Sequence, residues 1–107
     1  MKTVEEYYAI AKERFLDAHP ELRSGIESLT ADQAASLGMD VDQLKALQKD
    51  RAYAAYVREK KLDGMLFAIQ LAEPDKAVMV EAIEKYLRDH AKALGMSWEE
   101  FCIANEL

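Results

Sequence analysis

Four copies of a pattern that begins α-helices constrain the fold of this chain more than any other feature. In each copy, a Ser, Thr or Asp is followed three residues later by a Glu or Gln. The pairs are Thr3 and Glu6, Thr30 and Gln33, Asp40 and Gln43, and Ser97 and Glu100. Each pair can form a capping box, in which each side chain accepts a hydrogen bond from the backbone amide of the other residue. Because strand-like alternation is almost absent, we expect an all-α protein.

Apolar residues at helical spacing predict helices over residues 4–18, 20–29, 31–37, 41–61, 62–72, 76–94 and 98–104. The helix over 62–72 is apolar on almost every side, so we expect it at the centre of the bundle. The helices differ in length, which favours a compact irregular (orthogonal) bundle of six or seven helices over a regular four-helix bundle. A chain of 107 residues predicts a single domain over 1–107.

The same spacing predicts which residues face the core. The predicted core residues are Val4, Tyr8, Ala11, Phe15 and Ala18 in the first helix, Leu44, Leu47, Ala54 and Val57 in the fourth, and Val80, Ile83, Leu87, Ala91 and Leu94 in the sixth. Each set lies on one face of its helix.

Two similar segments, LGMDVDQL at 37–44 and LGMSWEEF at 94–101, have the spacing of a DNA-reading helix-turn-helix. In each, a small residue precedes the glycine by four positions, and a large apolar residue follows it by six. A transcriptional regulator is therefore one hypothesis, with Gln43, Lys45, Gln48 and Lys49 as its strongest residues. The acidic first turns of both second helices argue against DNA binding, since phosphates repel carboxylates.

The composition also bears on function. The chain has 14 Lys and Arg against 20 Asp and Glu, a net charge of -6, so nucleic-acid binding is disfavoured. No stretch is long and apolar enough to span a membrane, and Glu5 and Glu6 interrupt any signal peptide, so we expect a cytoplasmic protein without membrane contact. The single cysteine, Cys102, requires no oxidising compartment.

No catalytic, cofactor-binding or metal-binding pattern stands out. The two histidines, His19 and His90, lack a second ligand at helical spacing, and the glycine-rich and nucleophile motifs of common enzymes are absent. We therefore expect no cofactor, no metal and no enzymatic activity.

Six residues are candidates for an interaction site. They are Trp98 and, within the basic stretch RAYAAYVREKK, Arg51, Tyr53, Tyr56, Arg58 and Lys61. Tryptophan is enriched in binding hot spots, and tyrosines beside basic side chains suit an acidic partner or a single nucleic-acid strand. The alternative is structural: Trp98 packs back on the bundle, and the tyrosines cover the edge of the core.

The leading hypothesis is a small acidic module that acts through protein–protein interaction, with an unidentified protein or a second copy as partner. A specialised version is an inhibitor, for example one encoded by a phage, that docks on a basic surface of nucleic-acid-processing machinery.

The segments FLDAHPELRSGIESLT, ASLGMDVDQLKAL and ALGMSWEEFCIANEL together resemble a family of small all-helical bacterial proteins of unknown function. The resemblance covers nearly the whole chain. It implies a helical fold and a cytoplasmic bacterial origin, but no activity and no functional residues.

Overall fold

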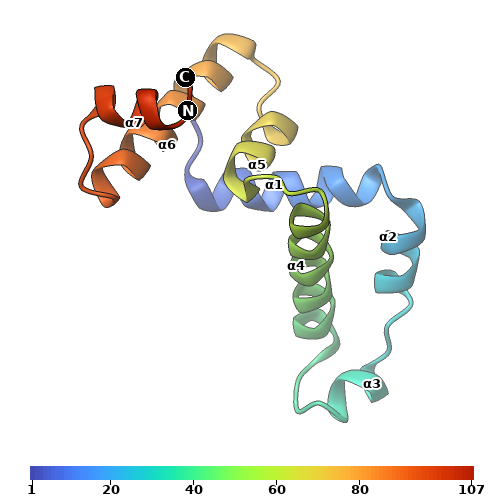
Figure 1. Cartoon of the computed structure of the whole chain (residues 1–107). Helices are drawn as coiled ribbons and strands as arrows, with labels where there is room; N and C mark the ends of the chain where they lie inside the picture. Colours follow the sequence, from blue (N-terminus) through green and yellow to red (C-terminus); the bar gives the residue numbers. More distant parts are fainter. The chain divides into compact units, whose positions relative to one another are not determined.

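The structure, a computed structural model, describes all residues from 1 to 107, and it contains seven α-helices and no strand (Figure 1). The helices are α1 (Val4–Asp17), α2 (Pro20–Glu27), α3 (Ala31–Ala35), α4 (Val41–Glu59), α5 (Gly64–Ala72), α6 (Lys76–Ala93) and α7 (Trp98–Ala104). This confirms the predicted all-α class and the predicted number of helices. The helices form two compact units, an N-terminal unit of residues 2–72 and a C-terminal unit of residues 73–107 together with Met1. The single domain expected from the chain length stays a prediction.

All four predicted capping boxes form. In α1, for example, the backbone amide of Glu6 donates to the Thr3 hydroxyl, and the amide of Thr3 donates to the Glu6 carboxylate. The boxes at the starts of α3, α4 and α7 have the same reciprocal bonds. These bonds satisfy amides that have no partner within the helix, which explains why the helix starts could be read from local sequence.

In the N-terminal unit, α1 packs mainly against α5, while α4 contacts α1, α2, α3 and α5. Phe15 and Leu16 of α1 and Ile69 of α5 are fully buried there. The helix predicted to be central is well covered: Met65, Ala68, Ile69 and Ala72 of α5 are buried, and Gln70 is its one exposed residue.

Three predicted core positions of this unit are wrong, since Val4, Ala18 and Ala54 are all exposed. Val4 is half exposed, and the buried stripe of α1 begins at Tyr7 instead. On α4, Ala54 is exposed and its neighbour Tyr53 is buried. Ala11 and Phe15 of α1 and Leu44 of α4 are buried as predicted, so the predicted faces are correct in part. On α4 the large ring of Tyr53 takes the core position, because it buries more area there than Ala54 would.

In the C-terminal unit, α6 and α7 pack together around Ala82, Ala91 and Phe101. The core face predicted for α6 is only partly correct, since Val80 and Leu94 are exposed. The helix α7 has only seven residues, so within this unit it covers a fraction of the 18-residue α6.

The two Leu-Gly-Met segments form matching helix corners. We call residues 34–44 the first corner and residues 91–101 the second corner. Gly38 and Gly95 adopt φ values of 75° and 70°, the left-handed conformation that ends a helix. The next residue closes the turn, since Met39 donates to Ala34 at 3.1 Å and Met96 donates to Ala91 at 2.9 Å.

Candidate functional site

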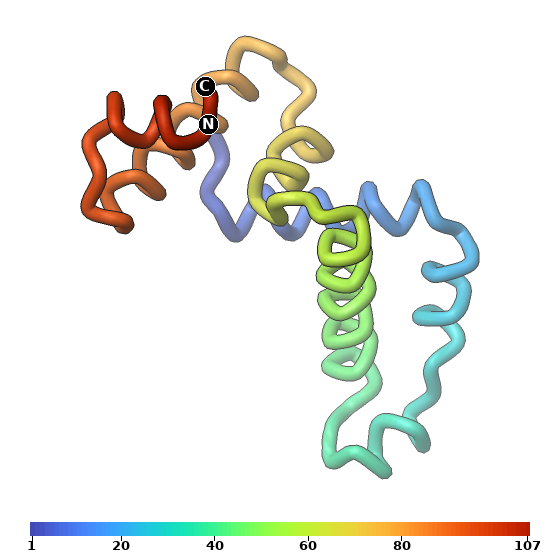
Figure 2. The backbone as a smooth tube through the Cα atoms, viewed as in Figure 1, coloured from blue at the N-terminus to red at the C-terminus, as the bar shows by residue number.

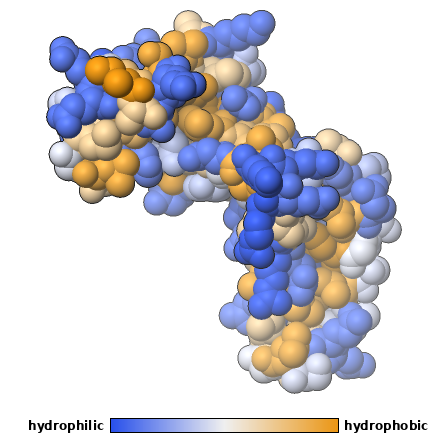
Figure 3. Space-filling model, in the orientation of Figure 1, coloured by the Kyte–Doolittle hydropathy of each residue, from blue (hydrophilic) through white to orange (hydrophobic).

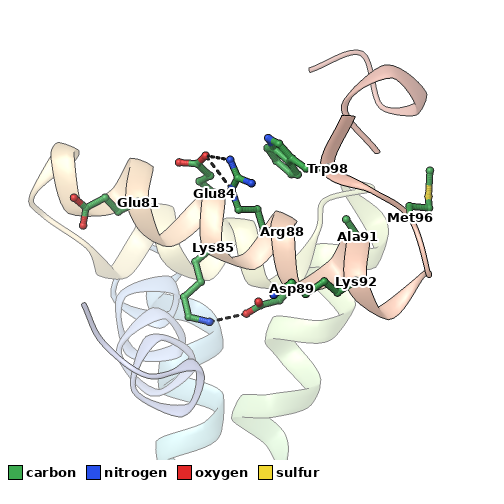
Figure 4. A pocket seen from close by; sticks show the side chains of 9 residues that line it. All are labelled: Glu81, Glu84, Lys85, Arg88, Asp89, Ala91, Lys92, Met96 and Trp98. Atoms are coloured by element: carbon green, nitrogen blue, oxygen red, sulfur yellow. Dashed lines mark hydrogen bonds and ion pairs between the residues drawn. The ribbon is translucent and has the colours of Figure 1, made fainter. Parts of the chain in front are cut away.

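Trp98 is the first residue of α7, directly after the Ser97 cap, and its side chain is half-buried. Its indole stacks on the ring of Phe101 at 5.9 Å between centroids. The guanidinium of Arg88 also lies over the indole, 4.4 Å from the centre of the ring (Figure 4). A cation over an indole face is attracted by the electrons of the ring. Trp98 is therefore held in place by its own unit while part of the ring stays accessible.

Arg88 is itself fixed by Glu84, one turn earlier on α6. Its Nε and Nη2 atoms donate to Oε1 of Glu84 at 3.1 and 2.8 Å. A second ion pair lies one residue further along α6, where Nζ of Lys85 donates to Oδ2 of Asp89 at 2.6 Å. This hydrogen bond lowers the pKa of the Asp89 carboxyl. The guanidinium of Arg88 can thus bond Glu84 and cover Trp98 at once, because its donors lie in the plane of the group and its face is free.

These charged pairs line one side of a shallow hollow of about 460 Å³ beside Trp98 (Figure 4). The charges that surround it largely neutralise one another through pairs one helical turn apart. No histidine, cysteine or serine lines the hollow.

A second, more apolar hollow of about 300 Å³ lies on another side of Trp98. We call its apolar lining the α6–α7 apolar surface, which comprises Val80, Ile83, Leu87, Trp98 and Leu107. Val80 and Leu107 are 64% and 65% exposed. A contiguous apolar surface next to a tryptophan whose side chain is fixed by its neighbours is typical of a protein-binding site.

The sequence indicates Trp98 but not its neighbours in this surface. Val80, Ile83 and Leu87 have the same helical spacing as a core stripe, and this spacing predicts that they are buried. Leu107 reaches the surface because the chain turns back at Glu106, whose φ is 57°. The amide of Leu107 then donates to the carbonyl of Cys102 at 2.9 Å. No sequence signal indicated that turn.

The candidate tyrosines do not form an exposed stacking platform. Tyr53 is only 5% exposed, and its hydroxyl donates to the carbonyl of Gly64 at 2.7 Å. Burial raises the pKa of Tyr53, so the hydroxyl keeps its proton and remains a donor. Tyr56 is half-buried, and the centroid of its ring lies 5.0 Å from that of Phe15 and 5.7 Å from that of Phe67. The prediction that Tyr53 is an interaction residue is thus wrong, because its ring is buried in the core of the unit.

The basic candidates, in contrast, lie on the surface. Arg51, Arg58 and Lys61 are all exposed, and none has a carboxylate within ion-pair distance. They lie in the N-terminal unit, whereas Trp98 lies in the C-terminal unit. The six candidate residues therefore divide between the two units.

The helix-turn-helix hypothesis finds little geometric support in the first corner. Lys45 and Lys49, the cations that would meet phosphates, pair with Glu27 at 3.7 Å and Glu13 at 2.8 Å. The side chain of Gln43 accepts the backbone amide of Asp40 in its capping box. In the second corner, Glu99 and Glu100 occupy the exposed first turn. A transcriptional regulator stays a prediction. Of the residues that would read DNA, Gln43, Lys45 and Lys49 already have partners within the protein.

The remaining titratable residues form no recognisable centre. No group of three or more His, Cys, Asp and Glu side chains is arranged to hold a metal ion. His19 bonds to the carbonyl of Phe15 at 2.8 Å, which ties the ring to the preceding helix. None of the helices is both long and apolar enough to cross a membrane.

Comparison with curated proteins and with solved structures finds no match to this chain. A family profile, described as a family of unknown function (DUF6388), matches residues 1–107. The chain therefore belongs to this family of unknown function, DUF6388, over its whole length.

Proposed function

We propose that this protein is a non-enzymatic module that binds another protein through the α6–α7 apolar surface. The observation that carries the proposal is the half-buried Trp98, held by Arg88 and Phe101 at the edge of exposed apolar side chains. A tryptophan held in this way loses little rotamer freedom when a partner binds. The proposal includes a bacterial cytoplasmic setting, in which the single cysteine stays reduced.

The size of the surface suits a small anchor on the partner. A hollow of about 300 Å³ accommodates one or two large apolar side chains beside the indole. Val80 and Leu107 would lose exposed area on binding, and each fully buried aliphatic side chain contributes about 1.5–3 kcal/mol. A few such contacts dominate the affinity of most protein interfaces.

In a more specific version of the proposal, basic residues of the partner surround its contact with the α6–α7 apolar surface. Glu99 follows Trp98 directly, is exposed and has no ion-pair partner within the protein. Together with the net charge of -6, this favours an inhibitor that docks on a basic surface, such as that of nucleic-acid-processing machinery. Binding of this kind weakens at high salt, because rim charges are screened.

The partner can also be a second copy of this chain. Size-exclusion chromatography with light scattering distinguishes this case, since a dimer through the α6–α7 apolar surface has twice the mass. The variant Val80→Asp, which puts a charge into the surface, would then return the protein to a monomer.

The main test compares capture of partners by matched variants. Trp98→Val places at the start of α7 the residue that the first corner has at the start of α4, Val41. The control is Leu37→Asp, at an exposed leucine of the N-terminal unit. We expect wild type and the control to retain the same protein from cells that make this protein naturally, and Trp98→Val and Val80→Asp to lose it. Retention by all four proteins, with dimerisation excluded, would contradict the proposal.

A further inference from the structure

Two residues that follow α7, Glu106 and Leu107, bring an apolar side chain to the α6–α7 apolar surface. We call these two residues the strap. Beyond α7 the backbone leaves the line of the helix (Figure 2). The side chain of Leu107 then lines the same hollow as Val80 and Trp98. The space-filling view shows apolar atoms on the surface around α6 and α7 (Figure 3).

Two backbone hydrogen bonds fold the strap back over the end of α7. The amide of Leu107 donates to the carbonyl of Cys102 at 2.9 Å, and the amide of Glu106 donates to the carbonyl of Ile103 at 3.4 Å. This pair of bonds is the Schellman motif, which ends many helices. Leu107 therefore reaches the surface only while this turn is formed.

Glu106 is an unfavourable residue for such a turn. Its φ of 57° lies in the left-handed region, which residues other than glycine adopt at a cost. The two helix corners have glycine at the equivalent position, Gly38 and Gly95. In addition, the carboxylate of Glu106 lies next to the carbonyl end of α7, where the helix dipole disfavours negative charge. The turn of the strap is thus less stable than the turns of the two corners.

Side-chain contacts add little to hold the strap in place. Leu107 is 65% exposed, and Glu106 is exposed and forms no ion pair. Segments with few buried contacts and with exposed hydrogen bonds open more easily than the rest of a protein. The strap therefore has two arrangements that are close in free energy, one closed and one released.

We propose that the strap regulates the α6–α7 apolar surface, because Leu107 completes this surface only when the strap is closed. An apolar ligand gains contact with Leu107 in the closed arrangement alone, so it binds that arrangement more tightly. Its apparent affinity is reduced by the fraction of molecules in which the strap is released. This regulation rests on the proposed function, since it acts on the same surface.

The end of α4 offers a matched control. Lys61 has a φ of 56°, and the amide of Leu62 donates to the carbonyl of Val57 in the same kind of turn. This turn lies in the N-terminal unit, away from the strap in sequence. Lys61→Gly therefore relieves the same backbone strain as Glu106→Gly and leaves the strap unchanged.

The first measurement is hydrogen exchange at the amide of Leu107 in the full chain, followed by NMR and corrected for the intrinsic rate of each sequence. Glu106→Gly removes the strain, whereas Glu106→Val increases it, because β-branched residues tolerate the left-handed conformation least. We expect protection of this amide to be about fivefold or more higher in Glu106→Gly than in Glu106→Val. Lys61→Gly should give the same protection as wild type.

The second measurement uses anilinonaphthalene sulfonate, a dye that binds exposed apolar surface. Trp98 is the only tryptophan, so energy transfer from its indole reports dye that is bound near the α6–α7 apolar surface. We expect Glu106→Gly to bind the dye about threefold or more tightly than Glu106→Val, in which the strap is released in more molecules. Leu107→Ala should bind it as weakly as Glu106→Val, and Lys61→Gly should bind it like wild type.

Three results would overturn the proposed regulation. The first is equal protection of the Leu107 amide in Glu106→Gly and Glu106→Val. The second is equal dye binding by these two variants, and the third is tighter binding by Glu106→Val, which would make Leu107 a cover that blocks the surface.

Circular dichroism shows whether each variant is folded. Should Glu106→Val disturb the fold, the comparison of Glu106→Gly with wild type decides both measurements. Neither measurement needs a partner protein, so failure to capture a partner would remove the proposed function and leave the result for the strap as measured.

Discussion

The two helix corners have the same backbone design but different surroundings. Each has a buried alanine, a left-handed glycine, a methionine amide that closes the turn, a capping box and a buried apolar residue. They differ at the first residue of the second helix, which is Val41 in the first corner and Trp98 in the second. The comparison shows that a local pattern sets how the chain turns, while the residue directly after the helix cap differs between the two corners.

The helices that follow the corners also differ. The 19-residue α4 packs against four other helices, so the first corner is part of a well-covered unit. The seven-residue α7 covers only part of α6 within its unit and leaves Val80 exposed. The length of the second helix therefore decides how much apolar surface remains near each corner.

The largest effect should come from the buried residue that anchors each second helix. Phe101→Ala should lower the free energy of unfolding by about 3–5 kcal/mol and Leu44→Ala by about 2–5 kcal/mol, because each leaves a cavity. Urea denaturation followed by circular dichroism measures both values. If the 107 residues form one cooperative domain, the fluorescence of Trp98 should report the same transition. A negligible loss in either variant would break the equivalence of the corners.

Substitution of the two corner glycines should cause the next largest loss of stability, and the loss should be the same in both corners. Gly38→Ala and Gly95→Ala should each cost about 1–2 kcal/mol, because L-residues disfavour the left-handed conformation. No atom crowds either position, so the cost is one of backbone strain alone. Gly25→Ala is the matched control: it lies within α2 with open space around it and should raise stability by about 0.5–1 kcal/mol. Thermal unfolding would show whether the two losses agree.

The capping residues should have a smaller effect. Asp40→Ala and Ser97→Ala each leave a helix amide without its partner, and each should cost about 1 kcal/mol. Substituting Asp40→Ser and Ser97→Asp exchanges the two caps and should preserve most of the stability. A loss in the exchange variant as large as in the alanine variants would show that the corners are not interchangeable.

The residue at which the corners differ should affect binding far more than stability. Trp98→Val loses the contact with Arg88 and the stacking on Phe101, and it should cost about 1–2 kcal/mol in thermal unfolding. The same variant should abolish capture of the partner, so stability and binding are affected very differently. A large loss of stability instead would mean that Trp98 serves the core of its unit.

Local sequence predicted the helices and their ends well but the packing only in part. Capping boxes and glycine turns involve residues within five positions of one another, so their geometry follows from a short segment. Core membership depends on which helix lies opposite. Val80 has the spacing of a core residue and is exposed, while Tyr53, predicted at the surface, is buried.

Only one residue of the candidate site, Trp98, could be predicted from the sequence. Trp98 was identified because a lone tryptophan beside a cap is conspicuous in the sequence. Arg88 and Leu107 were not, because their proximity to Trp98 depends on how α6, α7 and the turn at Glu106 come together. The hollow between α2 and α4 is unpredictable for the same reason, since its two sides come from separate helices.

The sequence alone thus determined that this chain is helical, where most of its helices begin and end, and that two of its corners are alike. These features depend on hydrogen bonds between close neighbours in the chain. Only the tertiary structure decided which apolar residues stay exposed and which cations stay unpaired. Burial and ion pairing depend on distant segments, as Lys49 with Glu13 and Arg51 without a partner show on a single helix.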